Sequence, residues 1–470
     1  MRLAIVILAA GKGTRLKSKR AKVLHEIGGK ALLRHVIDAA FEVVPAHDIY
    51  IVIGHQAEQV QASVAGLGVT CICQREQRGT GHAVQEALET VKDYEHLLVL
   101  SGDVPLIRQQ TIARLRDFHL EQRATMTILT AIPEDPCGYG RVIRKNTHPE
   151  EVLKIVEQKS LTPEQATVRE VNSGIYAFAR APLAASIRGL NTDNPHGEYY
   201  LTDMAAIFVK ACERVVAIRC DSAEEVLGAN TIQEMMRLDS AVRLRNAQRL
   251  MANGVTIFRP ETTVIDSDVV AGPDTVIEPF VQLLGKTAIG EDCRIRSYSV
   301  LENASLGNRV LVRNSCVIAQ SRIADGAVIG PFAHIRPDSE VGEEAHVGNF
   351  VEVKKTRLGK KSKANHLTYL GDAQIGAGVN VGAGVITCNY NGYEKTVTTI
   401  ADGVFVGSDS TLVAPLHLGP GSYVAAGSCI TEDVPADALA LGRARQTIKP
   451  GWAKERRNQS ASAQTAKEKP

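Results

Sequence analysis

The chain has 470 residues with 54 Lys and Arg against 52 Asp and Glu, so its formal net charge is only +2. A balance this close to zero argues neither for nor against a polyanionic partner, and the length suggests about three domains. We find no signal-peptide pattern and no apolar run long enough to cross a membrane, and we therefore expect a soluble cytoplasmic protein without a membrane partner.

Nine cysteines are scattered along the chain without any CxxC pair. The closest two are Cys71 and Cys73, which would share one face of a strand. This pattern favours a reducing compartment and small buried thiols over disulfides or a zinc site.

The first part of the chain alternates strand-like and helix-like segments. Leu3–Ala10 is a continuous apolar run, as in a buried parallel strand. We expect further strands at Ile49–Ile53, Val69–Cys73, Leu97–Leu100 and Thr125–Ala131, and helices at Lys30–Val44, Gln56–Ala65, Thr80–Val91 and Gln109–Glu121. The alternation predicts an α/β domain with a mainly parallel sheet, which binds ligands at the carboxyl ends of its strands.

Three polar features follow these strands. The loop Gly11–Arg15, with Lys22, offers backbone N–H groups and charge to a phosphate, although it is neither a Walker A loop nor GxGxxG. Gln74 and Gly79–Gly81 could contact a base edge, and Asp103 could bind Mg²⁺. The alternatives are a plain strand-to-helix turn, a helix cap at Thr80 and a capping Asp.

Asn230–Gly254 has apolar residues at helical steps and predicts one helix of ~35 Å at ~1.5 Å per residue. Its four arginines favour a solvated or interdomain face over a nucleic-acid stripe, because the total charge is near neutral.

From Val264 to Ile430 an aliphatic residue followed by Gly recurs at spacings that are multiples of six or one residue off. A period of six indicates a parallel β-helix of hexapeptide repeats, whereas a β-sandwich would carry no such period. We expect the repeat to be interrupted near Lys354–Tyr369 and Cys388–Thr399. The basic residues there suit an anionic sugar phosphate, and a solvated loop is the alternative.

The N-terminal part resembles the sugar-1-phosphate nucleotidylyltransferase family. The motifs are LAAGKGTRL at Leu8–Leu16, GTGHA at Gly79–Ala83, GYGRV at Gly138–Val142, IVEQKS at Ile155–Ser160, NSGIY at Asn172–Tyr176 and GAN at Gly228–Asn230. One departure is Ser101, where a larger residue is usual. The resemblance implies a nucleoside triphosphate held by Leu8, Ala9, Ala10, Gly11, Arg15 and Lys22, uracil read by Gln74, Gly79 and Thr80, an N-acetyl sugar held by Gly140, Glu157 and Asn172, and Mg²⁺ held by Asp103 and Asn230.

The second half resembles the acetyltransferase half of bacterial bifunctional enzymes that combine glucosamine-1-phosphate acetyltransferase and N-acetylglucosamine-1-phosphate uridylyltransferase. The similar stretches are GNFVEVKKTRLGKKSKANHLTYLGD, VGAGVITCNYNG and VFVGSDSTLVAP, so the whole match runs from about Leu3 to Arg443. It implies a left-handed β-helix and a homotrimer with acetyltransferase sites at subunit boundaries. It also implies glucosamine 1-phosphate on Arg336, Lys354, Tyr369, Asn380 and Lys395, a general base His366 with Glu352 near the amine, and acetyl-CoA along Ala383, Asn389, Tyr390, Ser408, Ala426 and Arg443.

These expectations give four parts: a uridylyltransferase domain (1–229) with a Rossmann-like mixed sheet, a linker helix (230–254), the β-helix (255–442) and a C-terminal arm (443–470). Residues 454–470 have almost no large apolar side chains, and we expect them to be disordered. The predicted activity is synthesis of UDP-N-acetylglucosamine for cell-wall and lipopolysaccharide assembly, with Mg²⁺ as cofactor and no nucleic-acid partner. The alternatives are a pyrophosphorylase with a purely structural β-helix, and a non-enzymatic sensing or assembly protein.

Overall fold

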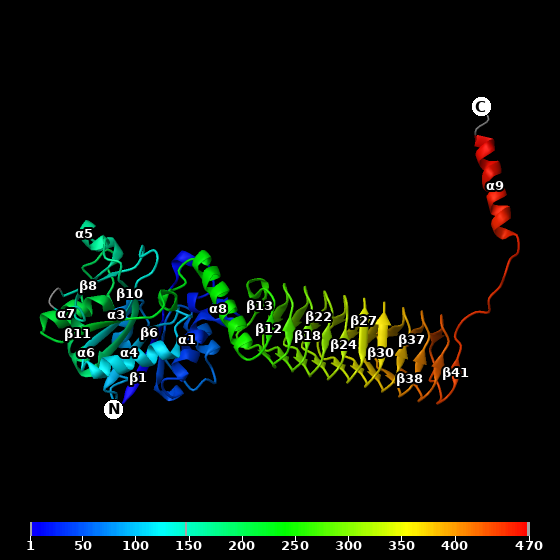
Figure 1. Cartoon of the computed structure of the whole chain (residues 1–470), viewed down its shortest axis with the longest axis horizontal. Coiled ribbons are helices and arrows are strands. Elements are labelled where there is room, and N and C mark those ends of the chain that lie inside the picture. The colour runs from blue at the N-terminus through cyan, green and yellow to red at the C-terminus, as the bar shows by residue number, and fades with distance from the viewer. Residues whose placement is uncertain (1, 146–147, 468–470) are drawn as a thin grey trace. The chain divides into compact units, whose positions relative to one another are not determined.

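The computed structural model describes residues 2–145 and 148–467 (Figure 1). Its contacts divide the chain into two units. The first contains the residues up to Leu250 together with Val264–Val269, and the second contains Met251–Thr263 and the residues from Val270 onward. No helix in the described ranges is long and apolar enough to span a membrane.

A mixed sheet forms the centre of the first unit, in the order β11-β7-β10-β6-β1-β4-β5. The strands are β1 (Leu3–Ala9), β4 (Ile49–Ile53), β5 (Thr70–Cys73), β6 (His96–Ser101), β7 (Met126–Ala131), β10 (Val171–Ala179) and β11 (Val215–Arg219). All neighbours pair in parallel except β10, which is antiparallel to β6 and β7. A hairpin of β8 (Arg141–Arg144) and β9 (Val152–Val156) joins β10, and β2 (Glu26–Ile27) pairs with β3 (Lys30–Ala31). The expected strands are thus confirmed.

Helices cover both faces of this sheet. They are α1 (Leu32–Phe41), α2 (Ala57–Ser63), α3 (Thr80–Ala87), α4 (Gln109–Glu121), α5 (Pro163–Ala166), α6 (Arg180–Ser186) and α7 (Met204–Lys210). Alternation along β1 sends Val6 to the core shared with α3 and α7, whereas Ile5 and Ile7 join the core shared with α1 and α4. The expected helices are confirmed, with the ends of α1 and α3 drawn in by a few residues.

The predicted long helix is α8 (Ile232–Ala252). Its buried residues Met235, Leu238 and Val242 pack with Leu32 and Leu106 of the first unit. Glu234 caps its start, because the Glu234 carboxylate accepts the N–H of Asn230 at 2.8 Å and that of Thr231 at 3.0 Å.

The second unit is a three-sided stack of short parallel strands. One sheet contains β12 (Thr256–Ile257), β15 (Val276–Ile277), β18 (Arg294–Ile295), β21 (Leu311–Val312), β24 (Val328–Ile329), β27 (His346–Asn349), β30 (Lys363–His366), β33 (Asn380–Val381), β36 (Phe405–Val406), β39 (Tyr423–Val424) and β41 (Leu439–Ala440). A second contains β16 (Gln282–Leu284), β19 (Val300–Glu302), β22 (Val317–Ala319), β25 (His334–Ile335), β28 (Glu352–Lys354), β31 (Tyr369–Gly371), β34 (Ile386–Cys388), β37 (Thr411–Val413) and β40 (Cys429–Ile430). A third contains β14 (Val270–Ala271), β17 (Ala288–Ile289), β20 (Ser305–Leu306), β23 (Arg322–Ile323), β26 (Glu340–Val341), β29 (Arg357–Leu358), β32 (Ala373–Ile375), β35 (Thr398–Ile400) and β38 (Leu416–Leu418). β13 (Val264–Ile265) lies in the part of the chain grouped with the first unit.

From β12 to β40 each strand that has a later partner pairs with the strand three positions later, except that β39 pairs with β41, so three strands make one coil. The register places Ile329, Val347, Ala364 and Val381 in one buried column. This arrangement confirms the β-helix predicted from the period of six, because three repeats fill one turn.

The prediction of an interruption at Lys354–Tyr369 is wrong, because the coil there has the regular length. Asn349 and His366 occupy equivalent positions only 17 residues apart, as in a regular coil. The aliphatic–Gly pattern fades there because Ala364 supplies the buried position. The second interruption is a real insertion, since 25 residues separate the hydrogen-bonded Ala377 and Asp402.

The expectation of disorder at the C-terminus is also wrong, because α9 extends over Trp452–Lys467. The segment lacks large apolar residues, but Ala, Gln, Glu, Lys and Arg are strong helix formers, and this propensity decides its structure. Residues 468–470 lie outside the described residues.

All nine cysteines are free, as expected. Their expected burial holds only in part, since Cys220, Cys293 and Cys316 are buried whereas Cys73, Cys137, Cys212 and Cys429 are exposed.

A buried histidine predicts acid sensitivity of the first unit. His119 on α4 is 1% exposed, and its ring nitrogens lie 2.8 Å from Thr127 Oγ1 and 3.1 Å from His96 Nδ1. Burial, with a smaller effect of His96, lowers the pKa of His119 to about 4. In the unfolded chain His119 is protonated below about pH 6.5, whereas in the folded chain it stays neutral until about pH 4. The contribution of His119 to the free energy of unfolding is therefore highest above pH 6.5 and falls as the pH drops toward 4.

We expect the transition of the first unit in thermal unfolding to lose up to about 3 kcal/mol of stability between pH 7 and pH 4, and His119→Gln to flatten this dependence. His47→Gln at an exposed position is the matched control. An unchanged pH dependence in the His119 variant would contradict this assignment.

Candidate active sites

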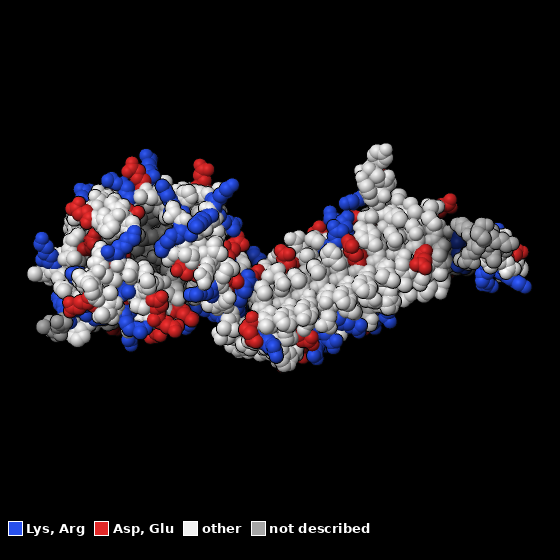
Figure 2. Space-filling model, turned by 90° about the horizontal axis from the view of Figure 1, so that it is seen from above, with Lys and Arg blue, Asp and Glu red and all other residues white. Residues whose placement is uncertain are grey.

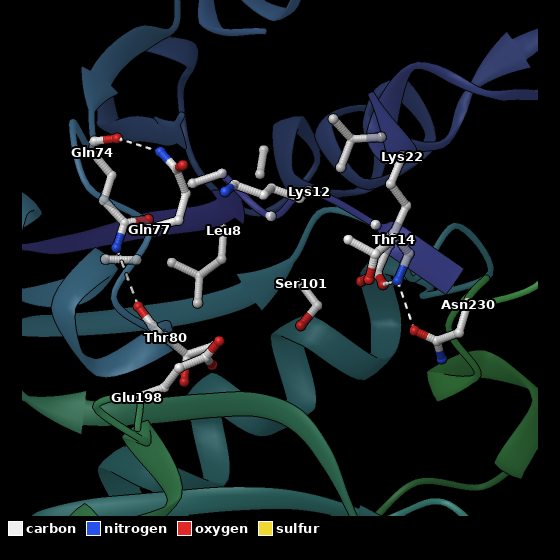
Figure 3. Close-up of a pocket in the computed structure, with 18 of the residues that line it drawn as sticks. Leu8, Lys12, Thr14, Lys22, Gln74, Gln77, Thr80, Ser101, Glu198 and Asn230 are labelled. Carbon is white, nitrogen blue, oxygen red and sulfur yellow. Dashed lines mark hydrogen bonds and ion pairs between the residues drawn. The ribbon is translucent and has the colours of Figure 1, made fainter. Parts of the chain in front are cut away.

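A cavity of about 530 Å³ opens at the carboxyl ends of β1, β5 and β6. Figure 3 shows its side chains pointing inward from loops that follow these strands, and Figure 2 shows a hollow in the first unit with Lys and Arg side chains beside it. The lining includes the expected residues Leu8, Ala9, Ala10, Gly11, Arg15, Lys22, Gln74, Gly79, Thr80, Asp103 and Asn230. The structure therefore brings together eleven predicted residues from separate stretches of the sequence.

The loop after β1 wraps closely around Lys22. Gly13 has a left-handed φ of 61°, and a Cβ added there would lie 2.6 Å from the Cβ of Lys22. A larger residue at this position would therefore push the loop away from Lys22.

Charged and amide groups converge on one side of the cavity. The ammonium of Lys22 contacts the Asp103 carboxylate and donates to Asn230 Oδ1 at 2.8 Å, and Arg15 donates to the same oxygen at 2.8 Å. Glu234 fixes the backbone of Asn230, because its carboxylate caps that N–H.

The Asp103 and Asn230 oxygens meet at a single cationic centre, the Lys22 nitrogen. One carboxylate and one carboxamide oxygen, completed by phosphate oxygens, form a donor set that Mg²⁺ accepts. In the described ranges no cluster of three or more His, Cys, Asp or Glu residues could hold a metal ion by itself. Any metal bound here would thus need further donors, such as phosphate oxygens of a substrate or water.

Gln74 lies at the opposite end of the cavity from this charged group in Figure 3. It is 2% exposed, and its amide nitrogen donates to the Gly79 carbonyl at 3.2 Å. Thr80 Oγ1 accepts the Leu201 N–H at 3.1 Å, which ties this turn to a later segment.

Gly140, Glu157 and Asn172 lie outside this lining but gather with one another. The Asn172 N–H donates to the Gly140 carbonyl at 2.9 Å, and a Cβ on Gly140 would lie 3.6 Å from Glu157 Oε2. Burial raises the pKa of Glu157, although Thr202 donates to its carboxylate at 3.1 Å. A carboxylate held this way suits acceptance of hydroxyl donors from a sugar.

Sequence reasoning gave no individual role to eight further lining residues. Lys12, Gly13 and Thr14 lie inside the predicted loop Gly11–Arg15, and Ala83 ends the GTGHA motif. Val23, Gln77, Ser101 and Glu198 also line the cavity, and the first three of these lie near a predicted residue. Glu198 carries no local pattern, since only tertiary packing brings its segment here. Ser101, the noted departure, donates to the Gly174 carbonyl at 3.4 Å.

The second predicted site divides into two groups in a single chain. His366 ends β30, at the corner between the first and second sheets of the β-helix. Its Nδ1 lies 2.8 Å from Asn349 Oδ1 on the preceding coil. A carboxamide oxygen only accepts, so Nδ1 carries the proton and Nε2 is the basic nitrogen.

The predicted acetyl-CoA residues Ala383, Ser408 and Ala426 stack beyond His366 on the same corner. Backbone bonds join the column: Gly384 N–H to His366 O at 3.3 Å, Asp409 N–H to Ala383 O at 2.7 Å, and Gly427 N–H to Ser408 O at 2.7 Å. Arg443 lies at the end of this column and donates to the Ala426 carbonyl at 2.8 Å. These predicted acetyl-CoA residues thus follow His366 along one corner of successive coils.

The predicted sugar-phosphate residues form the other group, at the far edge of the second sheet. Lys354 and Asp372 form an ion pair of 3.5 Å, and Asn389 donates to the same carboxylate. The Lys354 ammonium lowers the pKa of Lys395, so two positive charges lie close together. Such a pair suits a phosphate dianion.

The remaining predicted residues surround these two groups. Arg336 donates to Glu352 at 2.8 Å, and Glu352 is the register partner of Tyr369 on the second sheet. Asn380 begins β33, and Tyr390 is exposed and bridges to Lys395 in the insertion.

Asn349 and Asp372 were missed by sequence reasoning. The coil length could have found both, since Asn349 precedes His366 by 17 residues and Asp372 follows Lys354 by 18.

Comparisons with known proteins agree with both halves of this description. The MobA-like NTP transferase domain matches residues 5–198, and the bacterial transferase hexapeptide (six repeats) matches residues 321–355. The fold is therefore an NTP transferase α/β domain followed by the left-handed parallel β-helix of hexapeptide proteins.

Full-length relatives share the name "Bifunctional protein GlmU". The protein from Koribacter versatilis is 61% identical over 97% of both chains. Those from Solibacter usitatus and Streptococcus equi subsp. zooepidemicus are 51% and 46% identical over at least 96% of each chain. At this identity and coverage, the chain belongs to the GlmU family of bifunctional proteins.

Proposed function

We propose that this protein makes UDP-N-acetylglucosamine in two steps. It transfers an acetyl group from acetyl-CoA to glucosamine 1-phosphate, and then couples the product to UTP with release of pyrophosphate. The observation that carries the proposal is that one chain holds both a nucleotide-sized cavity with Lys22, Asp103 and Asn230 and a separate β-helix column containing His366.

The uridylyl step needs alignment and charge neutralisation. A phosphate oxygen of N-acetylglucosamine 1-phosphate attacks the α-phosphorus of UTP, and the bond to pyrophosphate breaks. The attacking oxygen is already an anion, so no general base is required. Arg15 and Lys22 neutralise charge on the phosphates, and Asp103 and Asn230 would hold Mg²⁺, which adds further neutralisation. Gly140, Glu157 and Asn172 hold the N-acetyl sugar.

The acetyl step needs a base. The substrate amine attacks the thioester carbonyl of acetyl-CoA, a C–N bond forms, and the C–S bond breaks to release the CoA thiol. His366 Nε2 accepts the amine proton, because Asn349 keeps the other ring nitrogen protonated. Lys354 and Lys395 hold the phosphate of the sugar, and the column from Ala383 to Ala426 carries acetyl-CoA.

We assign residues 1–229 to the uridylyltransferase domain, 230–254 to a connecting helix, 255–442 to the acetyltransferase domain and 443–470 to a C-terminal arm. We place the enzyme in the cytoplasm, where both co-substrates are made.

We also propose a homotrimer with the acetyltransferase site at subunit boundaries. An exposed aromatic ladder supports it: Phe280 stacks on Tyr298 at 5.2 Å and Phe332 on Phe350 at 5.3 Å. All four residues have positive φ values, which bulky residues rarely adopt. The ladder follows the corner that carries His366, so a second copy packed on it would reach the catalytic column.

We expect Phe332→Glu to yield monomers and to remove acetyltransferase activity while sparing uridylyl transfer, because burying an unpaired carboxylate costs several kcal/mol. Sedimentation velocity measures the assembly. Val270→Glu is the matched control, since Val270 lies on the third sheet and is 52% exposed, as is Phe332. A Phe332→Glu protein that remains trimeric would show that the ladder is not the contact.

The direct test of function supplies purified protein with glucosamine 1-phosphate, acetyl-CoA, UTP and Mg²⁺, and follows free CoA and pyrophosphate. Release of both, with UDP-N-acetylglucosamine as product, is expected. Pyrophosphate release from N-acetylglucosamine 1-phosphate without any CoA release would favour a structural β-helix. Release of neither would favour a non-enzymatic protein.

A further inference from the structure

We infer that His82 is a positioning residue that fixes the amide orientation of Gln74 and so makes the nucleotide cavity prefer a base with a ring N–H. The inference rests on the proposed uridylyltransferase function and adds a determinant of base specificity to the same site. Gln74 lines the cavity, whereas His82 touches it only through Gln74.

The contact with the Gly79 carbonyl identifies which atom of the Gln74 amide is the nitrogen. The Gln74 atom 3.2 Å from this carbonyl must be the nitrogen, because a carbonyl oxygen accepts and never donates. Figure 3 shows the Gln74 side chain reaching from the end of β5 toward the turn at Thr80. No donor among the described residues bonds Gln74 Oε1, so this oxygen is available to a ligand in the cavity.

His82 reinforces this orientation from α3. Its Nδ1 lies 2.9 Å from the same Gln74 nitrogen, so Nδ1 must accept. Its Nε2 lies 3.1 Å from Glu86 Oε1, one turn further along the helix, and a carboxylate accepts the Nε2 proton. The imidazole also lies against the ring of Tyr199, with centroids 6.4 Å apart. Glu86 therefore favours the His82 tautomer that carries its proton on Nε2. In this tautomer Nδ1 accepts from the Gln74 amide nitrogen, and the amide presents Oε1 to a ligand in the cavity.

The orientation of the Gln74 amide determines which nucleotide base the cavity prefers. Uracil carries an N–H at ring position 3, which Oε1 can accept, whereas cytosine carries a lone pair there. A reversed amide would present its NH₂ group and favour cytosine. Because Gln74 is 2% exposed, a wrong partner would leave a polar group buried and unpaired.

The test compares kcat/KM for UTP and CTP with N-acetylglucosamine 1-phosphate. We expect His82→Phe, which keeps a ring beside Tyr199 but has no acceptor, to lower the UTP-to-CTP ratio by about tenfold, mainly through KM for UTP. His82→Asn should restore much of the ratio, because its amide oxygen can take the place of Nδ1. His47→Phe, at an exposed position, is the control.

A second pair of variants leaves the cavity and His82 intact. Glu86 is 40% exposed, so substitutions there should fold. Glu86→Gln retains an acceptor for Nε2–H and should keep the UTP preference. Glu86→Lys offers a donor instead, which favours the tautomer with a proton on Nδ1 and should lower the ratio.

If wild-type protein released no pyrophosphate with any nucleotide, the uridylyltransferase proposal itself would fail. If wild type is active but the UTP-to-CTP ratio is the same in His82→Phe and Glu86→Lys, the positioning role of His82 is overturned. Equal losses in His82→Asn and His82→Phe would also overturn it. Thermal stability alone would not move this ratio, so a merely structural role is distinguishable.

Discussion

Replacement of Asp103 by alanine is expected to lower uridylyl transfer by at least about a hundredfold, on the scale seen when one preorganised charge-stabilising group is removed. The Asp103 carboxylate is one of two side-chain oxygens that converge on the cationic centre of the cavity, together with Asn230. Without it, only Asn230 of the proposed pair would remain to hold Mg²⁺, and the ammonium of Lys22 would lose its counter-charge. The effect should appear chiefly in kcat, because the phosphate-binding loop is retained.

Pyrophosphate release with saturating UTP and N-acetylglucosamine 1-phosphate measures this loss. Acetyl transfer by the same protein should be unchanged, since the β-helix is a separate unit. Asp93→Ala removes an exposed carboxylate elsewhere in the first unit and should be silent. Asp103→Ala protein that retains wild-type pyrophosphate release would remove Asp103 from the proposed metal site.

Replacement of His366 by alanine is expected to lower acetyl transfer by about 10²–10⁴-fold, the usual contribution of a general base. His366 is exposed at a corner of the coil, so its removal should not disturb the buried column. Asn349→Ala should give a smaller loss and alter the pH profile, because Nδ1 would lose the acceptor that sets the tautomer.

Release of CoA in the presence of glucosamine 1-phosphate measures this step. Uridylyl transfer to N-acetylglucosamine 1-phosphate should be retained in full. His417→Ala is the matched control, since His417 is exposed on the third sheet. Wild-type CoA release by the His366 variant would leave the acetyltransferase site without its proposed base.

The sequence predicts most of the nucleotide cavity because its parts follow buried strands. The Gly11 loop, Gln74 and Asp103 each stand directly after an apolar run, and parallel strands bring their carboxyl ends to one edge. Glu198 escapes this reasoning, since it lies in a connection whose position depends on packing against the Gly79 turn.

For the β-helix, the sequence predicts the coils better than it predicts the contacts between them. Its period predicts the coils, and the same period relates Asn349 to His366 and Lys354 to Asp372. A motif is defined by neighbours along the chain, whereas these partners are neighbours across coils, so only one member of each pair has a predicted role. The predicted interruption near Lys354 reflects a change of composition rather than a change of length, because Ala364 replaces the usual large aliphatic residue.

The measurement that tests the central claim most directly mixes the Asp103→Ala and His366→Ala proteins with glucosamine 1-phosphate, acetyl-CoA and UTP. Each variant alone should form almost no UDP-N-acetylglucosamine. The mixture should form it readily, because the Asp103 variant supplies the acetylated sugar phosphate and the His366 variant couples it to UTP. A mixture as inactive as its components, or full synthesis by either variant alone, would contradict two separate active sites in one chain.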